Sequence, residues 1–304
     1  MTLISKILFK NRFSLYILPQ LMKMKITRDI LFVIFNRLSF IEKEELYYHA
    51  KEIFLKNKLK IKSGDNKIIF NGKALRIPYY QGPLFNMATA FSYLGHDYDV
   101  KMCYQDLINL FGIKTFYDVG ANYGQHTILM MSQGINCYSF EPNKNCHQHL
   151  IYAAKYNNFS NYKLIKKAVG SKIESLFLNF NSKETWNGKI STKQTTDVNE
   201  TSYEVQVIKL DSFISENSIP DLIKIDTEGH EIQVLLGANN LIETYRPFII
   251  FESLTAEILK FFKMHSYSVL SIINNYKPII NENESLNNFL ACPVEKSKRI
   301  NKFD

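Results

Sequence analysis

Residues 115–124, TFYDVGANYG, are the most informative segment of this chain about its fold class. It starts as a short apolar strand and ends in a turn with glycines at 120 and 124, after which a helix is predicted over 124–132. Glycine at these positions allows a tight turn and a close approach of the backbone to a ligand. The dinucleotide fingerprint G-x-G-x-x-G, counted from Gly120, requires glycines where Asn122 and Gln125 stand. The turn therefore does not predict a pyrophosphate site.

Two carboxylates flank this turn. Asp118 precedes it, where a negative charge repels a phosphate but attracts a cation or an amino group. Glu141 ends the next predicted strand, 21 residues after Gly120, where a carboxylate can accept hydrogen bonds from both ribose hydroxyls. A nucleoside that carries an amino acid and a positive centre, but no pyrophosphate, fits both positions. S-adenosylmethionine is such a ligand.

The stretch LIKIDTEGHE, residues 222–231, ends a second apolar strand in three carboxylates and a histidine. Ligands of open α/β sheets bind beyond the carboxyl ends of the strands, so Asp226 is expected at the same rim as the two carboxylates above. Glu252 ends the following strand at that rim. Such acids can position a hydroxyl, act as a general base or hold a divalent cation. Simpler interpretations are a helix-dipole role for Glu231 and solvent contact for His230.

Around these motifs, short apolar strands alternate with helices. Strands are predicted at 115–120, 136–141, 162–169, 203–210, 222–226, 248–252, 267–273 and 288–294, and helices at 124–132, 144–157, 231–244 and 255–264. The alternation predicts a mostly parallel sheet with helices on both faces. The polar stretch 181–201 is predicted to be a loop over one end of this sheet.

The N-terminal part of the chain has a different character, and we predict an extension over 1–105 before a catalytic domain over 106–304. Residues 1–60 hold 12 Lys/Arg and 5 Asp/Glu, a net charge of +7 out of +8 for the whole chain. Within them, the apolar residues Ile26, Ile30, Leu31, Ile34, Phe35 and Leu38 follow helical spacing. Thr27 is the predicted cap of this helix.

A basic amphipathic helix of this kind has three interpretations, which the sequence leaves open. It packs against the main domain with a solvated basic face, it lies on an anionic membrane surface, or it contacts nucleic acid. A short hairpin is predicted after it, over 61–80, with its turn at Asn71–Gly72. Helices are predicted at 84–94 and 100–111.

The cysteines and the hydropathy of the sequence indicate the cellular compartment. Four cysteines stand far apart without a CxxC spacing, which argues against a disulfide framework or a structural zinc site and favours a reducing compartment. The longest apolar run, 30–35, is far shorter than the about 20 residues that a spanning helix needs. We therefore expect a cytoplasmic protein, or one peripheral to the inner face of a membrane.

Taken together, the motifs resemble the FkbM-type methyltransferases, within the class I S-adenosylmethionine-dependent methyltransferases. The residues that carry the resemblance occur in the family's order: YDVGANYGQHT (117–127), YSFEPN (138–143), KKAVG (166–170), VIKLDSF (207–213), DLIKIDTEGHE (221–231), LLGANNLI (235–242) and RPFIIFES (246–253). They cover about 110–294. The resemblance implies an α/β fold with a doubly wound, seven-stranded, mostly parallel Rossmann-like sheet, preceded by the helical and hairpin extension.

The resemblance also implies roles for individual residues. The methionine end of the cofactor would be lined by Asp118, Gly120, Asn122 and Gly124, and Ala121 would also bind the cofactor. Glu141 would hold the ribose, with Pro142 beside the adenine and Ala168, at the end of the third strand, bordering it. Asp226 would face the methionine moiety or the acceptor. The implied reaction is methylation of a hydroxyl on a sugar, a glycan or a small natural product, with lipid-linked sugars among the candidate acceptors.

A sugar hydroxyl is a poor nucleophile, so a base or a metal ion must take its proton. The catalytic candidates are Glu228 and His230, followed by Asp226 and Glu252. A magnesium ion held by the three carboxylates of this set is an alternative that their spacing does not establish.

Three other functions are alternatives to O-methylation of a sugar or small natural product. A nucleic-acid methyltransferase is disfavoured by the near-neutral body of the chain and by the absence of a [DN]-P-P-[YFW] turn after the fourth strand. A nicotinamide oxidoreductase is disfavoured because this chain lacks the second and third glycines of the dinucleotide fingerprint. A membrane-associated cofactor-binding module without catalysis stays open. The aromatic residues Tyr79, Tyr80 and Trp186 are candidates for stacking on a sugar ring or for the core.

Overall fold

The structure is a computed structural model, and it describes residues 24–57, 63–79, 87–181, 188–214, 218–281 and 288–300. The chain folds into two compact units. The smaller unit comprises Met1–Gln105 with Ala153–Asn158, and the larger unit comprises Asp106–Tyr152 with Phe159–Asp304. Of the three aromatic candidates for sugar stacking, Tyr80 and Trp186 lie outside the described residues.

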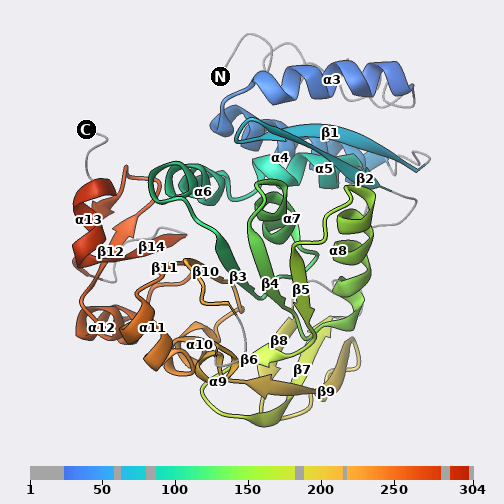
Figure 1. The fold of residues 1–304 in the computed structure, drawn as a ribbon. Helices are drawn as coiled ribbons and strands as arrows, with labels where there is room; N and C mark the ends of the chain where they lie inside the picture. The colour runs from blue at the N-terminus through green and yellow to red at the C-terminus, as the bar shows by residue number, and fades with distance from the viewer. Residues whose placement is uncertain are drawn as a thin grey trace. The chain divides into compact units, whose positions relative to one another are not determined.

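The larger unit is built on one large twisted sheet (Figure 1). Its described strands follow the order β13-β12-β14-β11-β10-β3-β4-β5. Their bounds are β3 Thr115–Val119, β4 Asn136–Phe140, β5 Tyr162–Ile165, β10 Leu222–Ile225, β11 Phe248–Phe251, β12 Tyr267–Ser271, β13 Lys277–Pro278 and β14 Phe289–Pro293. Strands β5, β4, β3, β10 and β11 are parallel, and β14 runs antiparallel between β11 and β12. The predicted Rossmann-like α/β fold is confirmed, and β13 adds a two-residue edge strand to the predicted seven.

Burial explains why these short segments form strands. Every residue of β3, β10 and β11 is buried, as expected for central parallel strands whose two faces are both covered. The covering helices are α7 Gln125–Ser132, α8 Lys144–Tyr156, α9 Leu210–Phe213, α10 Glu231–Leu236, α11 Asn239–Tyr245, α12 Ala256–Met264 and α13 Val294–Ile300. The predicted single helix over 231–244 is two helices, α10 and α11, and α10 ends just before Gly237, where a Cβ would lie 1.9 Å from the carbonyl oxygen of Gly170.

The larger unit contains a second sheet that the sequence did not predict. Strands β6 Ala168–Val169, β7 Glu174–Asn181, β8 Gly188–Ser191 and β9 Glu200–Ile208 form a four-stranded sheet in the order β6-β9-β7-β8. The predicted strand 162–169 therefore ends at Ile165, and part of the polar loop predicted over 181–201 is strand. In β7, Leu176, Leu178 and Phe180 alternate with exposed or half-buried residues and form a small core with β6 and β9. No strand was predicted over 174–181, although its apolar residues alternate with a period of two.

The smaller unit consists of helices around a hairpin. Its elements are α3 Lys25–Arg37, α4 Phe40–Asn57, β1 Gly64–Phe70, β2 Lys73–Tyr79, α5 Met87–Gly95 and the start of α6 Tyr98–Phe111. The predicted hairpin is confirmed, with positive φ angles at Asn71 and Gly72 as a type I′ turn requires. The predicted cap is wrong, because α3 begins at Lys25 and Thr27 lies inside it. Among the described residues, none of the helices has the length and hydropathy needed to cross a membrane.

Candidate functional site

The glycine turn after β3 owes its shape to three residues with positive φ angles, which are 81° at Gly120, 51° at Asn122 and 80° at Gly124. A Cβ on Gly120 would lie 1.7 Å from the backbone oxygen of Asp226, so only glycine fits where the turn passes the end of β10. The backbone N–H of Gly120 also donates to the carbonyl oxygen of Phe140 at 3.0 Å. The turn is thus fixed between the carboxyl ends of β10 and β4.

Asp118, one residue before the end of β3, is completely buried. Its Oδ2 accepts hydrogen bonds from the backbone N–H of Thr127 at 3.1 Å and from the Thr127 hydroxyl at 2.6 Å. Its Oδ1 is buried without a hydrogen-bond partner in the described residues. Burial raises the pKa of Asp118, and the charge of Lys224 opposes this shift. An unpaired buried carboxylate oxygen is an atom that a cationic ligand would satisfy.

Glu141 follows β4 and is held at both oxygens. Oε2 accepts from the backbone N–H of Asn122 at 2.7 Å, and Oε1 accepts from that of Asn143 at 2.6 Å. Burial raises the pKa of Glu141 to about 7. The carboxylate therefore ties the glycine turn to the turn before α8, a structural role that the sequence did not indicate. Each oxygen retains a second acceptor position.

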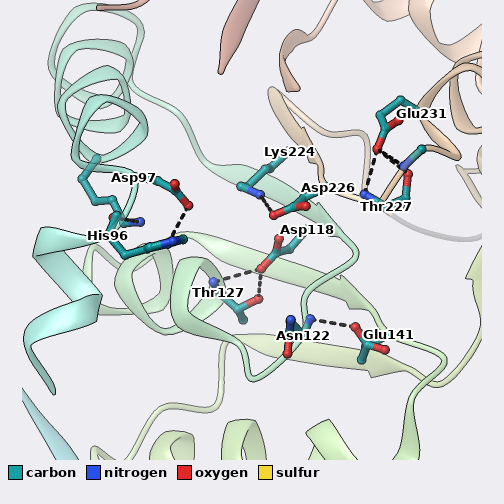
Figure 2. A network of polar contacts seen from close by, with 12 residues as sticks. His96, Asp97, Asp118, Asn122, Thr127, Glu141, Lys224, Asp226, Thr227 and Glu231 are labelled. Carbon is teal, nitrogen blue, oxygen red and sulfur yellow. Dashed lines mark hydrogen bonds and ion pairs between the residues drawn. The ribbon is translucent and has the colours of Figure 1, made fainter. Parts of the chain in front are cut away.

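The end of β10 carries an ion pair. Lys224, whose side chain is 3% exposed, donates to Oδ2 of Asp226 at 2.6 Å. Glu252, just after β11, has a pKa raised to about 7 by burial, by the charge of Asp226 and by a hydrogen bond with it. Figure 2 shows Lys224 and Asp226 beside Asp118, which in turn reaches Thr127. The carboxyl ends of β3, β10 and β11 thus bring three predicted acids together around one lysine.

The loop after Asp226 is organised by Glu231. Its Oε1 accepts from the backbone N–H groups of Thr227 and Gly229, both at 3.1 Å, and from the Thr227 hydroxyl at 3.2 Å. Figure 2 shows these contacts at the start of α10. Glu231 is therefore a structural carboxylate of the first helical turn, as its simpler interpretation predicted.

The two leading base candidates lie on this loop but face different surroundings. Glu228 is exposed, has a φ of 55°, and has a pKa raised by partial burial and by the charge of Asp226. His230 is half-buried at the start of α10, and burial lowers its pKa, so its imidazole is neutral at pH 7. A Cβ on Gly170 would lie 3.2 Å from its Nε2, so His230 faces the chain between β6 and β7.

The four-stranded sheet reaches the turn after β4 through Tyr203 of β9. The hydroxyl of Tyr203 accepts from the backbone N–H of Lys144 at 3.0 Å and donates to Oδ1 of Asn143 at 3.2 Å. Ala168, predicted to end the third strand, is instead a buried residue of β6, paired with Val207. Its place beside an adenine, like that of Pro142, stays a prediction.

The FkbM methyltransferase domain model matches residues 118–275, which begin at Asp118 and include every catalytic candidate. The chain belongs to the FkbM methyltransferase family. A stretch of 141 residues is 28% identical to the hexuronic acid methyltransferase AglP of Haloferax volcanii, and it covers 45% of this chain and 54% of that protein. The chain thus spans about half the length of this curated relative.

Solved methyltransferase structures are also similar to the chain, at low identity. The methyltransferase FkbM of Methylobacillus flagellatus KT has a TM-score of 0.40 and 14% identity, over 66% of this chain and 56% of that one. The tRNA (uracil-54, C5)-methyltransferase of Pyrococcus abyssi, in complex with S-adenosyl-L-homocysteine, has a TM-score of 0.36 and 11% identity, over 75% and 43%.

No metal centre accompanies the site of this FkbM-family chain in the ranges that the structure describes, where no three His, Cys, Asp or Glu side chains group as metal ligands. Asp226 is instead paired with Lys224, and Glu252 with Asp226. The magnesium alternative drawn from these carboxylates and Glu228 therefore finds no support in the described residues.

Three further residues of the candidate site were not predicted from the sequence: Thr127, Tyr203 and Lys224. A signal for Lys224 was present, because a lysine inside an apolar strand, two residues before an acid, points to the same face as that acid. Thr127 and Tyr203 carried no such signal, since their partners lie on other elements.

Proposed function

We propose that this chain is an S-adenosylmethionine-dependent O-methyltransferase that acts on a hydroxyl of a sugar or glycan. The observation that carries the proposal is the unpaired, buried Oδ1 of Asp118, next to a glycine turn that Glu141 anchors. Membership of the FkbM methyltransferase family supports the reaction class. The name of the relative AglP, a hexuronic acid methyltransferase, supports a sugar acceptor.

The residues present fit the proposed cofactor. Asp118 Oδ1 would pair with its positive centre or its amino group, and the remaining acceptor positions of Glu141 would take the ribose hydroxyls. Gly120 leaves the backbone between Asp118 and Glu141 without a side chain. Ala121, Asn122 and Gly124 complete this turn. When bound, the cofactor supplies a methyl group that its sulfonium charge already activates.

The chain itself must hold the acceptor hydroxyl and take its proton. Glu228 is our first candidate base, since its exposure leaves it accessible and its raised pKa brings it closer to neutral pH. His230 is the second, because it is neutral at pH 7. Asp226 would orient the hydroxyl, and Glu252, hydrogen-bonded to Asp226, would support it. Alignment of the reacting atoms contributes most of the remaining acceleration.

The test is methyl transfer from isotope-labelled S-adenosylmethionine, with products mapped by mass spectrometry. The acceptor panel contains uronic-acid glycans, neutral glycans, lipid-linked sugars and RNA. We expect label on a sugar hydroxyl. Label on RNA alone would favour the rival nucleic-acid methyltransferase. Tight cofactor binding without label on any acceptor would favour the binding module.

Replacing Glu228 by glutamine should lower turnover about 100-fold, because the amide cannot accept the hydroxyl proton. Cofactor affinity, measured by calorimetry, should stay within about twofold, since Glu228 lies outside the glycine turn. The matched control is Glu243→Gln, on the exposed side of α11, for which we expect wild-type turnover. A normal rate in Glu228→Gln would remove this residue as the base and leave His230.

A membrane surface is a second proposed partner, favoured by the outward face of α3. Ile26, Ile30 and Val33 are 63%, 55% and 54% exposed there, on the side opposite the buried Leu31 and Phe35. Residues 1–60 carry a net charge of +7. An apolar stripe within a basic segment is typical of helices that lie on anionic bilayers. A lipid-linked sugar would then meet the enzyme at that surface.

Vesicle flotation tests this partner with the full chain. We expect flotation with vesicles that contain phosphatidylglycerol and at least tenfold less with pure phosphatidylcholine, because each basic residue contributes about 1 kcal/mol at an anionic surface. Ile30→Ser with Val33→Ser should abolish flotation, whereas Met264→Ser, at an exposed residue of the larger unit, should not. Equal flotation of the two variants would contradict a role for α3.

A further inference from the structure

Lys224 is the one charged residue of β10, and it lies where the sheet is fully covered. The neighbouring residues Leu222, Ile223 and Ile225 are apolar and buried. In the register of the parallel strands, Lys224 lies level with Asp118 on β3 and with Ile250 on β11. Its ammonium group thus enters the site from the centre of the sheet, between the strands that carry the predicted acids.

An apolar side chain at this position would stabilise the sheet as well as the lysine does, or better. Burying an ammonium group costs several kcal/mol, and replacing a buried ion pair by apolar residues is often neutral or stabilising. Loss of one partner, in contrast, destabilises because the other charge stays buried alone. The lysine is therefore explained by the acids of the site rather than by the packing of the strand.

The geometry of the pair gives Lys224 a specific task. Residues two apart on a strand point to the same face, so the backbone of β10 sets Lys224 and Asp226 side by side. The 2.6 Å contact occupies Oδ2 of Asp226. The Asp226 side chain is 31% exposed, whereas that of Lys224 is 3% exposed, so the carboxylate lies at the open end of the pair. A charged partner at this distance fixes the rotamer of Asp226.

We propose that Lys224 is a positioning residue for methyl transfer, which holds the Asp226 carboxylate in the orientation that receives the acceptor hydroxyl. The inference rests on the proposed function, and it assigns to Lys224 a role that acts through Asp226 during turnover.

A double-mutant cycle tests this role. Lys224→Met keeps the apolar stem without the charge, Asp226→Asn removes the partner, and the double variant removes both. We expect Lys224→Met to lower kcat about 100-fold, with the acceptor KM and the Kd of S-adenosylhomocysteine each within about fivefold of wild type. Because Lys224 acts through Asp226, the double variant should be no slower than Asp226→Asn. Single-turnover assays with radiolabelled cofactor keep such low rates measurable.

Each outcome has a distinct meaning. Multiplying effects in the double variant, or a wild-type kcat in Lys224→Met, would overturn the inference and leave the proposed function intact. A wild-type protein that binds no S-adenosylmethionine would overturn both. Should Lys224→Met fail to fold, the double variant, in which neither member of the Lys224–Asp226 pair is left charged without the other, is compared with Asp226→Asn, and a slower double variant overturns the inference. Lys260→Met, an exposed residue of α12, is the control expected to match wild type.

Discussion

Gly120→Ala is expected to destabilise the protein by more than about 3 kcal/mol and to abolish cofactor binding. The new Cβ would lie 1.7 Å from the backbone oxygen of Asp226, and the φ angle of 81° disfavours any side chain. Because the obstructing atom is backbone, no rotamer change relieves the clash. The end of β10 must then move away from the turn, and Asp226 with it. Thermal and urea denaturation measure the first effect, and calorimetry with S-adenosylmethionine measures the second.

Gly134→Ala is the matched control for this prediction. Gly134 also has a φ of 81°, but a Cβ there meets no atom within 4 Å. The substitution should therefore cost only the left-handed backbone strain of a residue with a side chain, about 1 kcal/mol, and the variant should bind the cofactor normally. Equal destabilisation by the two substitutions would show that backbone strain, and not the contact with Asp226, governs the turn.

Asp118→Asn is expected to weaken binding of S-adenosylmethionine about 100-fold, equivalent to about 2.7 kcal/mol. The amide oxygen can still accept from Thr127, so the local structure is retained. The amide nitrogen then takes the place of Oδ1, where it presents a donor to the positive centre of the ligand. The loss should therefore come from charge and hydrogen-bond polarity at one atom.

Calorimetry on folded protein checks this result, with the melting temperature as the measure of folding. Asp197→Asn, at an exposed position in the loop before β9, is the control and should bind like wild type. Undiminished affinity of Asp118→Asn would contradict the assignment of Asp118 to the cofactor and, with it, the observation that carries the proposed function.

The amino-acid sequence alone predicted the fold class and the rim of the sheet where the candidate site lies. Apolar strands and amphipathic helices are local patterns of burial, so their alternation predicts a parallel sheet before any contact is known. Asp118 and Glu141 follow from the same logic, since each lies at the carboxyl end of a predicted strand. The glycines at 120 and 124 mark a turn because their conformation is a local property of the backbone.

The pairing of the acids at that rim could not be predicted without the folded chain. The Gly120–Asp226 contact and the Lys224–Asp118 register both require β10 to lie next to β3, although β4 follows β3 in the chain. The second sheet was not predicted from the sequence, because the pairing of β7 with β8 and β9 joins segments that are separate along the chain. Strand order and small local cores depend on long-range packing, which residue periodicity does not encode.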